Sequence, residues 1–277
     1  MRAGQPSQTA RGAAAYRAIH QIHEGAAIFR DPFAERILDG EMRAALDELA
    51  ANPSLRGIRL FIVSRSRFSE ETLASCVARG ARQVVVLGAG LDTFSLRNPF
   101  AQVRVFEVDF PATQGWKRER LREGGLVIPE TLTFAPVDFE RESLADGLAR
   151  VGFRRDQPAF FQWLGVVPYL TREAILSTLD FIAAIPGSAT VFDYTEPFEN
   201  HPPERRANLM AMAERAAARG EPWLSFFDPV ELSEMLREKG FADLEDLVFA
   251  ELVHRYSPAL AEGLVRGPGG HVIRACR

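Results

Sequence analysis

The chain has 277 residues, of which 47% are hydrophobic and 25% are charged, an ordinary composition for a globular protein with one sizeable core. Its 33 basic and 37 acidic residues leave a formal net charge of −4, which gives no general attraction for nucleic acid or anionic lipid. The two cysteines, Cys76 and Cys276, indicate neither a disulfide framework nor a zinc cluster. The N-terminus lacks a continuous apolar stretch, and no window is apolar enough to span a bilayer. We therefore expect a cytoplasmic protein without a metal and without nucleic-acid or membrane partners.

Residues 1–80 are predicted to form a helical cover ahead of the first strand. Residues 13–29 and 31–50 are rich in alanine and place apolar side chains near a 3.6-residue period, with a break around Asp31 and Pro32. A further amphipathic stretch, from Ile58 to Arg79, is expected to end at Gly80.

From Val84 onward, apolar runs alternate with helical patterns. The runs are almost continuously hydrophobic, which is typical of strands buried on both faces of a parallel sheet. Strands are expected in the run that begins at Val84 and at 104–110, 132–139, 159–167 and 189–195, with helices at 112–123, 141–151 and 172–185. This alternation predicts a single domain with a doubly wound α/β fold.

The pattern changes after the fifth expected strand. Residues 196–227 are polar, bounded by prolines and helical in their middle, which indicates an inserted helical cap. A helix at 229–239, a strand around 244–253 and a last strand at 271–275 follow, with a glycine-rich turn at 267–270. The two strands are expected to form an antiparallel hairpin at one edge of the sheet.

The most informative segment is VVVLGAGLDTFSLR, residues 84–97, in which an apolar run ends in Gly88, Ala89 and Gly90. The two glycines can adopt positive φ and lack a Cβ, so a nucleotide-like ligand can lie against this loop. Glu107 and Asp109 end the next expected strand, about 20 residues later, where ribose hydroxyls are usually bound.

Asp138 ends the third expected strand and has two interpretations. Its carboxylate could accept a hydrogen bond from the exocyclic amine of adenine while the Phe139 ring packs on the base. It could instead cap the helix expected to begin near Arg141.

The residues around the glycine turn distinguish between cofactors. Dinucleotide sites usually have a third small residue where this chain has Thr93, and the Asp92 carboxylate is unfavourable near a diphosphate. S-adenosylmethionine has no phosphate but carries a carboxylate, for which Arg65 and Arg67 are available, although either could be a surface cation. The pattern favours S-adenosylmethionine, with a nicotinamide-dependent oxidoreductase as the alternative.

Seven segments occur in order along the chain: TARGAAAYRA, IFRDPFAE, SRSRF, RQVVVLGAGLDTFSLR, VFEVDFP, WLGVVPYLT and VFDYTEP. With this set the chain resembles the leucine carboxyl methyltransferase-like family of class I S-adenosylmethionine-dependent methyltransferases, from about Thr9 to the last strand. The resemblance implies a seven-stranded sheet with a reversed last strand, N-terminal helices that help to cover the site, and a cap after the fifth strand.

The resemblance also implies roles for individual residues. Arg65 would bind the methionyl carboxylate, Asp109 the ribose, and Asp138 with Phe139 the adenine, while Gly88 and Gly90 would line the cofactor loop, with Ala89 and Asp92 beside them. The chain departs from the family at Leu164, where an acidic residue is frequent, so a cofactor contact is lost or moved to Gln162. It departs again at Phe94, which replaces a basic residue.

The identity of the methyl acceptor decides whether the reaction needs a general base. Transfer from a sulfonium is an in-line displacement in which positioning dominates, and a carboxylate needs no base, whereas a hydroxyl, phenol or amine benefits from one. The catalytic candidates are His20, Tyr194 and His201. The alternative, which is favoured for the two histidines, is that they are a residue of an exposed helix face, a buried aromatic ring and an idle loop residue. We expect O-methylation of a carboxylate or hydroxyl of a small, polyketide-like molecule by a monomer or homodimer. The alternatives are an NAD(P)-dependent oxidoreductase and a catalytically silent cofactor-binding protein.

Overall fold

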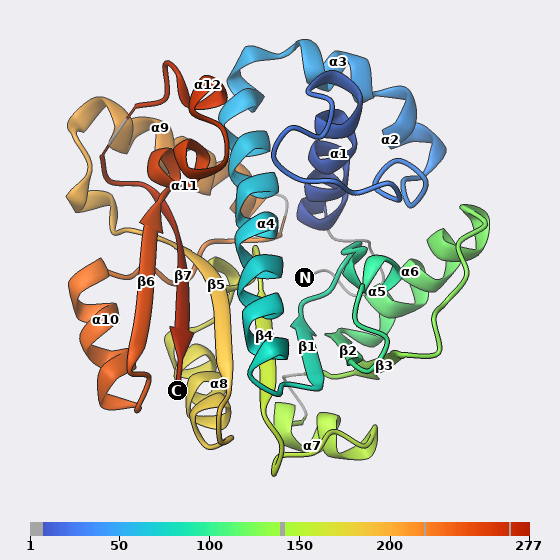
Figure 1. The fold of residues 1–277 in the computed structure, drawn as a ribbon. Helices are drawn as coiled ribbons and strands as arrows, with labels where there is room; N and C mark the ends of the chain where they lie inside the picture. Colours follow the sequence, from blue (N-terminus) through green and yellow to red (C-terminus); the bar gives the residue numbers. More distant parts are fainter. Residues whose placement is uncertain (1–7, 139–141, 219, 266) are drawn as a thin grey trace.

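A seven-stranded sheet organises the computed structural model, which describes residues 8–138, 142–218, 220–265 and 267–277. The strands are β1 (Gln83–Leu87), β2 (Arg104–Asp109), β3 (Leu132–Pro136), β4 (Ala159–Trp163), β5 (Ala189–Thr195), β6 (Asp243–Val248) and β7 (Gly270–Cys276). Their order is β3-β2-β1-β4-β5-β7-β6; β1 to β5 pair in parallel, and β7 is antiparallel to β5 and β6 (Figure 1). The predicted doubly wound α/β fold with a reversed last strand is confirmed.

The sheet is covered on both faces, which explains why its central strands β1 and β4 are buried at every position. In β1, Val84 and Val86 pack on one face and Val85 and Leu87 on the other. The first face lies against α4 (Arg56–Ala78) and the N-terminal helices. The second face lies against α7 (Leu144–Arg150), α8 (Arg172–Ala183) and α10 (Pro229–Glu238). Helix α5 (Phe94–Arg97) lies between β1 and β2, and α6 (Pro111–Glu123) lies between β2 and β3.

The N-terminal region has the predicted break around Asp31 and Pro32, but it differs from its prediction in the residues that follow. Helix α1 (Gln8–His23) ends before Gly25, which has a φ of +57°. The helix expected at 31–50 is replaced by turns over 32–38, followed by α2 (Gly40–Ala44), α3 (Leu46–Ala51) and η1 (Pro53–Leu55). The Asp31 carboxylate accepts the Phe33 N–H at 3.2 Å, which stabilises a turn at the point where a helix was expected.

The C-terminal region contains a second departure. The strand predicted around 244–253 ends at Val248, and Phe249–Tyr256 form α11, whose Ala250 and Val253 side chains are buried one helical turn apart. Helix α12 (Pro258–Ala261) follows, so β6 and β7 are joined by helices and not by a tight hairpin. The segment predicted as a cap follows β5 and contains η3 (Phe198–Asn200) and α9 (Pro203–Ala218).

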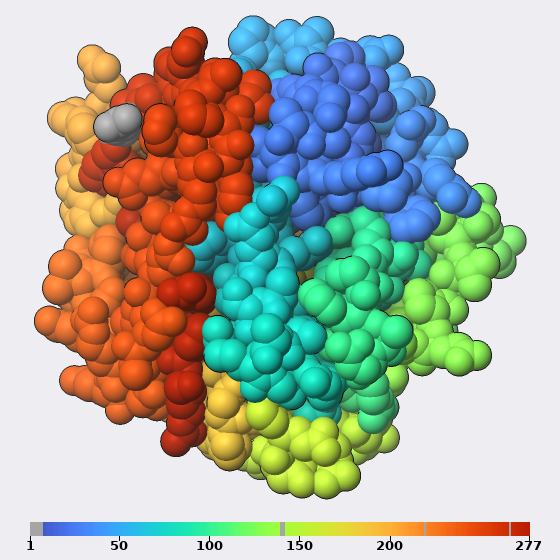
Figure 2. Space-filling model, in the orientation of Figure 1, coloured from blue at the N-terminus to red at the C-terminus, as the bar shows by residue number. Residues whose placement is uncertain are grey.

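Two groups of helices lie over the carboxyl ends of the parallel strands. In Figure 1, α1 to α3 stand above β1 and β2, whereas α9, α11 and α12 stand above β5 to β7. The space-filling view shows the N-terminal residues packed directly on α4 and on the chain around α5 (Figure 2). Across the described ranges, no helix has both the length and the apolar composition needed to cross a bilayer.

Candidate functional site

The loop after β1 is closely packed on two sides. Gly88 and Gly90 have φ values of +60° and +45°, in the left-handed region that favours glycine. A Cβ on Gly88 would lie 2.6 Å from Cγ2 of Val166, and one on Gly90 would lie 2.9 Å from Cβ of Ala10. Between them, the Ala89 N–H donates to the Val108 carbonyl at 3.1 Å. The loop lies between α1 and the chain that follows β4, so neither glycine position has room for a side chain.

Asp109 lies against this loop. Its Oδ2 accepts the Gly90 N–H at 2.6 Å, and its Oδ1 accepts the Phe110 N–H at 2.7 Å. Burial raises the pKa of the carboxyl, although the two N–H groups oppose this effect. The structure thus brings together two groups that the sequence singled out 19 residues apart.

Asp92 and Glu107 form contacts that stabilise the segment after the glycine loop. The Asp92 carboxylate accepts the Phe94 N–H at 2.7 Å at the start of α5. The Lys117 ammonium donates to the Asp92 carbonyl at 2.6 Å and forms an ion pair with Glu107 at 2.6 Å. Glu107 is fully buried and also accepts the Ser95 hydroxyl at 2.7 Å. Of the two acidic residues at the end of β2, Asp109 therefore contacts the glycine loop and Glu107 is occupied by Lys117.

Arg65 on α4 reaches the ends of β4 and β5. Its Nη1 donates to Oδ2 of Asp193 at 2.6 Å, and Oδ1 of Asp193 accepts the Gly165 N–H at 2.5 Å. A Cβ on Gly165 would lie 2.9 Å from Nη2 of Arg65. The buried Nε of Arg65 has no hydrogen-bond partner among the described residues. Arg67, by contrast, is exposed and pairs with Glu71.

Two further predicted cofactor contacts, Gln162 and Asp138, lie near the carboxyl ends of these strands. Gln162 is buried between β4 and α4 and accepts the Ser69 hydroxyl at 2.8 Å. Asp138 is half-buried beyond β3, and its carbonyl accepts the Glu142 N–H at 2.9 Å. Helix α7 begins at Leu144 with Ser143 as its N-cap. The capping alternative for Asp138 depends on residues 139–141, which lie outside the described residues, and it stays a prediction. Phe139 lies outside the described residues. Leu164 packs at the margin of the apolar core.

The catalytic candidates have other partners. His20 is fully buried: its Nδ1 lies 2.6 Å from Oε2 of Glu24, and its Nε2 accepts the N–H groups of Ile28 and Phe29 at 3.1 and 3.3 Å. Both nitrogens of His20 thus hold the turn after α1, and neither is left for an acceptor. The Tyr194 hydroxyl donates to Asp246, and burial raises the pKa of this tyrosine.

His201 is the candidate with the least hydrogen bonding. It is 2% exposed, and neither ring nitrogen has a well-formed hydrogen bond within the described chain. Burial and the neighbouring positive charge of Arg205 lower its pKa, so the ring is neutral near pH 7. It lies at the base of α9, next to η3.

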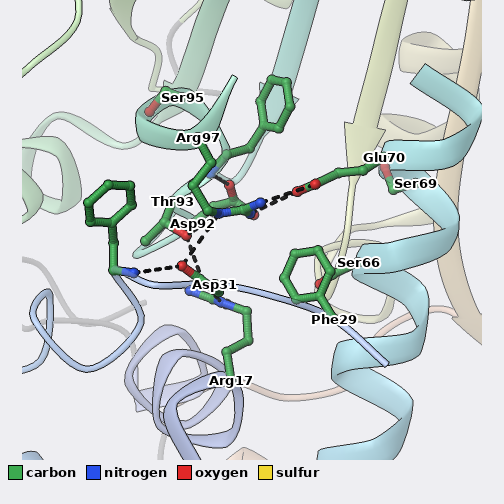
Figure 3. Close-up of polar contacts among 12 residues, drawn as sticks. Arg17, Phe29, Asp31, Ser66, Ser69, Glu70, Asp92, Thr93, Ser95 and Arg97 are labelled. Carbon is green, nitrogen blue, oxygen red and sulfur yellow. Dashed lines mark hydrogen bonds and ion pairs between the residues drawn. The ribbon is translucent and has the colours of Figure 1, made fainter. Parts of the chain in front are cut away.

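A buried charged cluster that the sequence analysis did not assign lies beside the loop. Asp31, Thr93 and Arg97 contact one another there, together with Arg17 from α1 and Glu70 from α4 (Figure 3). The available signal was the segment IFRDPFAE, in which an aspartate interrupts an otherwise helical pattern. Within the described ranges, no three His, Cys, Asp or Glu side chains are grouped to hold a metal.

With this geometry in place, comparison with known proteins identifies the family. The sequence profile described as leucine carboxyl methyltransferase matches residues 10–183. This chain belongs to the leucine carboxyl methyltransferase family. The match includes the N-terminal helices, the glycine loop, β2 to β4 and α8.

Curated relatives agree. YktD of Bacillus subtilis, whose name describes an expected S-adenosyl-L-methionine-dependent methyltransferase, is 37% identical over 201 residues, which cover 68% of this chain and 66% of YktD. A Mycobacterium avium protein with the same description is 30% identical over 287 residues, covering 92% of this chain and 89% of that protein. The family and these relatives show that the chain is an S-adenosyl-L-methionine-dependent methyltransferase.

Solved structures share the fold. A Thermobifida fusca protein described as an expected methyltransferase superposes with a TM-score of 0.61 at 15% identity, covering 100% of this chain and 96% of that one. The magnesium protoporphyrin IX methyltransferase of Synechocystis, solved with S-adenosylhomocysteine, gives a TM-score of 0.50 at 14% identity, covering 96% and 99%. At these identities the likeness supports the class I methyltransferase fold alone.

The residues at the carboxyl ends of the strands fit S-adenosylmethionine, the methyl donor of this family. The two glycine positions leave no room for a side chain where the backbone borders the site. Arg65 retains a buried Nε–H without a partner in the described chain, which suits a ligand carboxylate. The Asp92 carboxylate beside the loop would repel a diphosphate, which favours a sulfonium cofactor over a dinucleotide.

Proposed function

We propose that S-adenosylmethionine lies across the carboxyl ends of β1, β2 and β4. Arg65 would bind the methionyl carboxylate and Asp109 the ribose hydroxyls, with Asp138 at the adenine. The backbone of Gly88, Ala89 and Gly90 would border the cofactor, with Asp92 and Gln162 at the margins. The support is geometric, since Asp109 and Gly90 are in contact and Arg65 lies beside Gly165 at the neighbouring strand end.

We further propose that the protein methylates an oxygen atom of a small molecule, and that this oxygen belongs to a carboxylate. The observation that carries the proposal is the placement of the five histidines. His20 is hydrogen-bonded through both nitrogens, and His271 lies between Glu196 and Asp246. His23 and His254 are exposed, and His201 is enclosed at the base of the cap. No imidazole is thus presented as a base beside the glycine loop, and a carboxylate needs none because it is already ionised at neutral pH.

The cap favours an apolar acceptor. Helix α9 has no buried residue, and Met210 and Met212 are 45% and 40% exposed on it. Flexible methionine side chains adapt to irregular apolar ligands. The Tyr169 hydroxyl lies 3.4 Å from the Thr9 hydroxyl at the junction between the cap side and α1. These features fit an organic acid with an extended apolar body, such as a polyketide-like metabolite.

The test is transfer of a labelled methyl group from S-adenosylmethionine to a panel of carboxylic acids, phenols, alcohols and amines. A methyl ester releases labelled methanol in mild base, whereas an ether or a methylamine does not, so base treatment identifies the methylated group. We expect base-labile product from one or more apolar acids. Asp109→Ala, which removes the proposed ribose contact, should transfer less label than the wild type when S-adenosylmethionine is limiting.

Three results would contradict the proposal. Base-stable product from phenols or alcohols alone would replace the carboxylate by a hydroxyl and make His201 the candidate base. Label on nitrogen would exclude O-methylation. No transfer to any acceptor, with normal S-adenosylhomocysteine binding, would identify a catalytically silent cofactor-binding protein, to which the departure at Leu164 would then be relevant.

A further inference from the structure

Asp31 is an acidic side chain with no solvent exposure, in a segment that belongs to neither the sheet nor a helix. Its backbone N–H donates to Oε1 of Gln21 on α1 at 2.8 Å. An ionised carboxylate at such a position is costly unless charges and hydrogen bonds compensate it. The partners of Asp31 therefore show what the buried charge holds together.

Three side chains compensate the Asp31 carboxylate. Arg17 donates from Nε to Oδ2 at 2.9 Å, and the Thr93 hydroxyl donates to the same oxygen at 2.7 Å. The Nε of Arg97 lies 3.4 Å from Oδ1. Burial opposes ionisation, but the charges of Arg17 and Arg97 outweigh it and lower the pKa of Asp31. Asp31 is consequently an anion at neutral pH.

These partners follow the glycine loop directly in the sequence. Thr93 and Arg97 lie three and seven residues after Gly90. Arg17 also donates from Nη2 to the Leu91 carbonyl at 2.7 Å, so its guanidinium joins Asp31 to the backbone immediately after Gly90. The N-terminal helix thus contacts the loop at two points, at Leu91 through Arg17 and at Gly90 through Ala10.

The cluster continues to the helix that carries Arg65. Arg97 donates to the two carboxylate oxygens of Glu70 on α4 at 2.7 and 3.0 Å, and its guanidinium lies over the Phe29 ring at 4.8 Å (Figure 3). Asp31, through Arg97, is therefore linked both to the segment after the loop and to α4. These are two of the elements that supply the proposed cofactor contacts.

We propose that Asp31 is a positioning residue for S-adenosylmethionine binding, which ties the N-terminal cover to the cofactor loop through Arg17, Thr93 and Arg97. It does not touch the cofactor itself. Its effect follows from preorganisation, since a loop that is already fixed loses less conformational freedom when the ligand binds. Linkage then requires the reciprocal effect, that bound cofactor tightens the cover. The inference rests on the methyl donor and is independent of the acceptor proposed above.

The first experiment compares Asp31→Asn with Glu24→Gln by calorimetric titration with S-adenosylhomocysteine. Glu24 is a matched control, because it pairs with Arg59 in the same cover at 2.9 Å and bonds His20, and none of these contacts involves the loop. We expect Asp31→Asn to raise the dissociation constant at least tenfold, and Glu24→Gln to leave it within twofold while lowering the melting temperature. Equal affinities for Asp31→Asn and the wild type would overturn the proposal, as would equal weakening by both variants.

A second pair of variants keeps the test decisive if Asp31→Asn does not fold. Thr93→Ser retains the hydroxyl that donates to Asp31, and Thr93→Val replaces it with a methyl group of similar size. We expect near wild-type affinity for Thr93→Ser and at least fivefold weaker binding for Thr93→Val. Hydrogen exchange of residues 8–38 should be slowed by S-adenosylhomocysteine in the wild type and in Thr93→Ser, and much less in Thr93→Val. Identical affinity and identical protection in the two Thr93 variants would refute the coupling.

Discussion

The chain that covers the carboxyl ends of the strands is held differently on the β1–β2 side of the sheet and on the β5 side. Over β1 and β2, the chain is held by two buried ion pairs, Arg17 with Asp31 and Lys117 with Glu107, and a third buried pair joins Arg65 on α4 to Asp193 on β5, beside the end of β4. Over the end of β5, the long helix α9 has no buried residue at all. The chain over β1, β2 and β4, which we propose to bind the methyl donor and call the donor side, thus has many contacts that fix one geometry, whereas the proposed cap has few. This contrast suits an enzyme whose cofactor is common to a family and whose acceptor varies.

The largest expected effect comes from filling the donor side at its tightest point. Gly88→Ala would force a Cβ to within 2.6 Å of Val166 at a φ of +60°. Backbone strain and overpacking together should lower the free energy of unfolding by about 3 kcal/mol and abolish measurable S-adenosylhomocysteine binding. Urea unfolding and calorimetric titration measure the two effects.

Gly25→Ala is the matched control for Gly88→Ala. Gly25 has a φ of +57°, but a Cβ there would meet nothing within 4 Å. Backbone strain alone should lower the free energy of unfolding of Gly25→Ala by about 1 kcal/mol, and the variant should keep its affinity for S-adenosylhomocysteine. If the two variants were equally unstable, the close approach of Val166 would not be the cause.

Removing the proposed ribose contact should have a smaller effect that is specific to binding. Asp109→Ala should weaken S-adenosylhomocysteine binding at least tenfold, which corresponds to about 1.4 kcal/mol. Asp156→Ala, on an exposed loop residue paired with Arg154, is the control and should bind normally. Wild-type affinity in Asp109→Ala would remove this residue from the proposed site.

The donor side was largely predictable from sequence because its signals are local. Unbroken apolar runs located the strands, and the glycine turn with the acidic end of the next strand located the loop and Asp109. Asp31 was not predictable in the same way, since its partners Arg17, Thr93 and Arg97 lie 14 to 66 residues away. A turn held by such contacts overrides the local helical pattern. At α11 likewise, an apolar segment read as a continued strand is helical because it packs against α4.

The junction between the sheet and the cap should respond to pH. Burial favours the neutral His271 ring, but hydrogen bonds and charges from Asp246 and Glu196 outweigh it and raise the pKa. A raised pKa in the folded state means that this stabilisation is complete below the unfolded value of about 6.5 and is lost as pH rises through the folded value. The free energy of unfolding should therefore decline above neutrality.

His271→Gln should flatten this decline, since the titrating ring is gone. His254→Gln, which changes an exposed histidine on α11, is the control and should keep the wild-type pH profile. Chemical unfolding at a series of pH values from about 6 to 9 measures both. A wild-type slope in His271→Gln would show that another group titrates in this range.

The smallest effect on stability is expected in the cap, and it tests the contrast most directly. Met212→Ala on α9 should change the free energy of unfolding by less than about 0.5 kcal/mol, because the side chain is 40% exposed and the helix has no buried residue. If α9 contacts the acceptor, the same substitution should raise the KM for an apolar acid severalfold with an unchanged KM for S-adenosylmethionine. Val127→Ala, at an apolar residue that is 85% exposed before β3, should change neither constant. A large loss of stability in Met212→Ala would mean that the proposed cap is as firmly packed as the donor side. The contrast between a rigid donor side and an adaptable acceptor side would then be wrong.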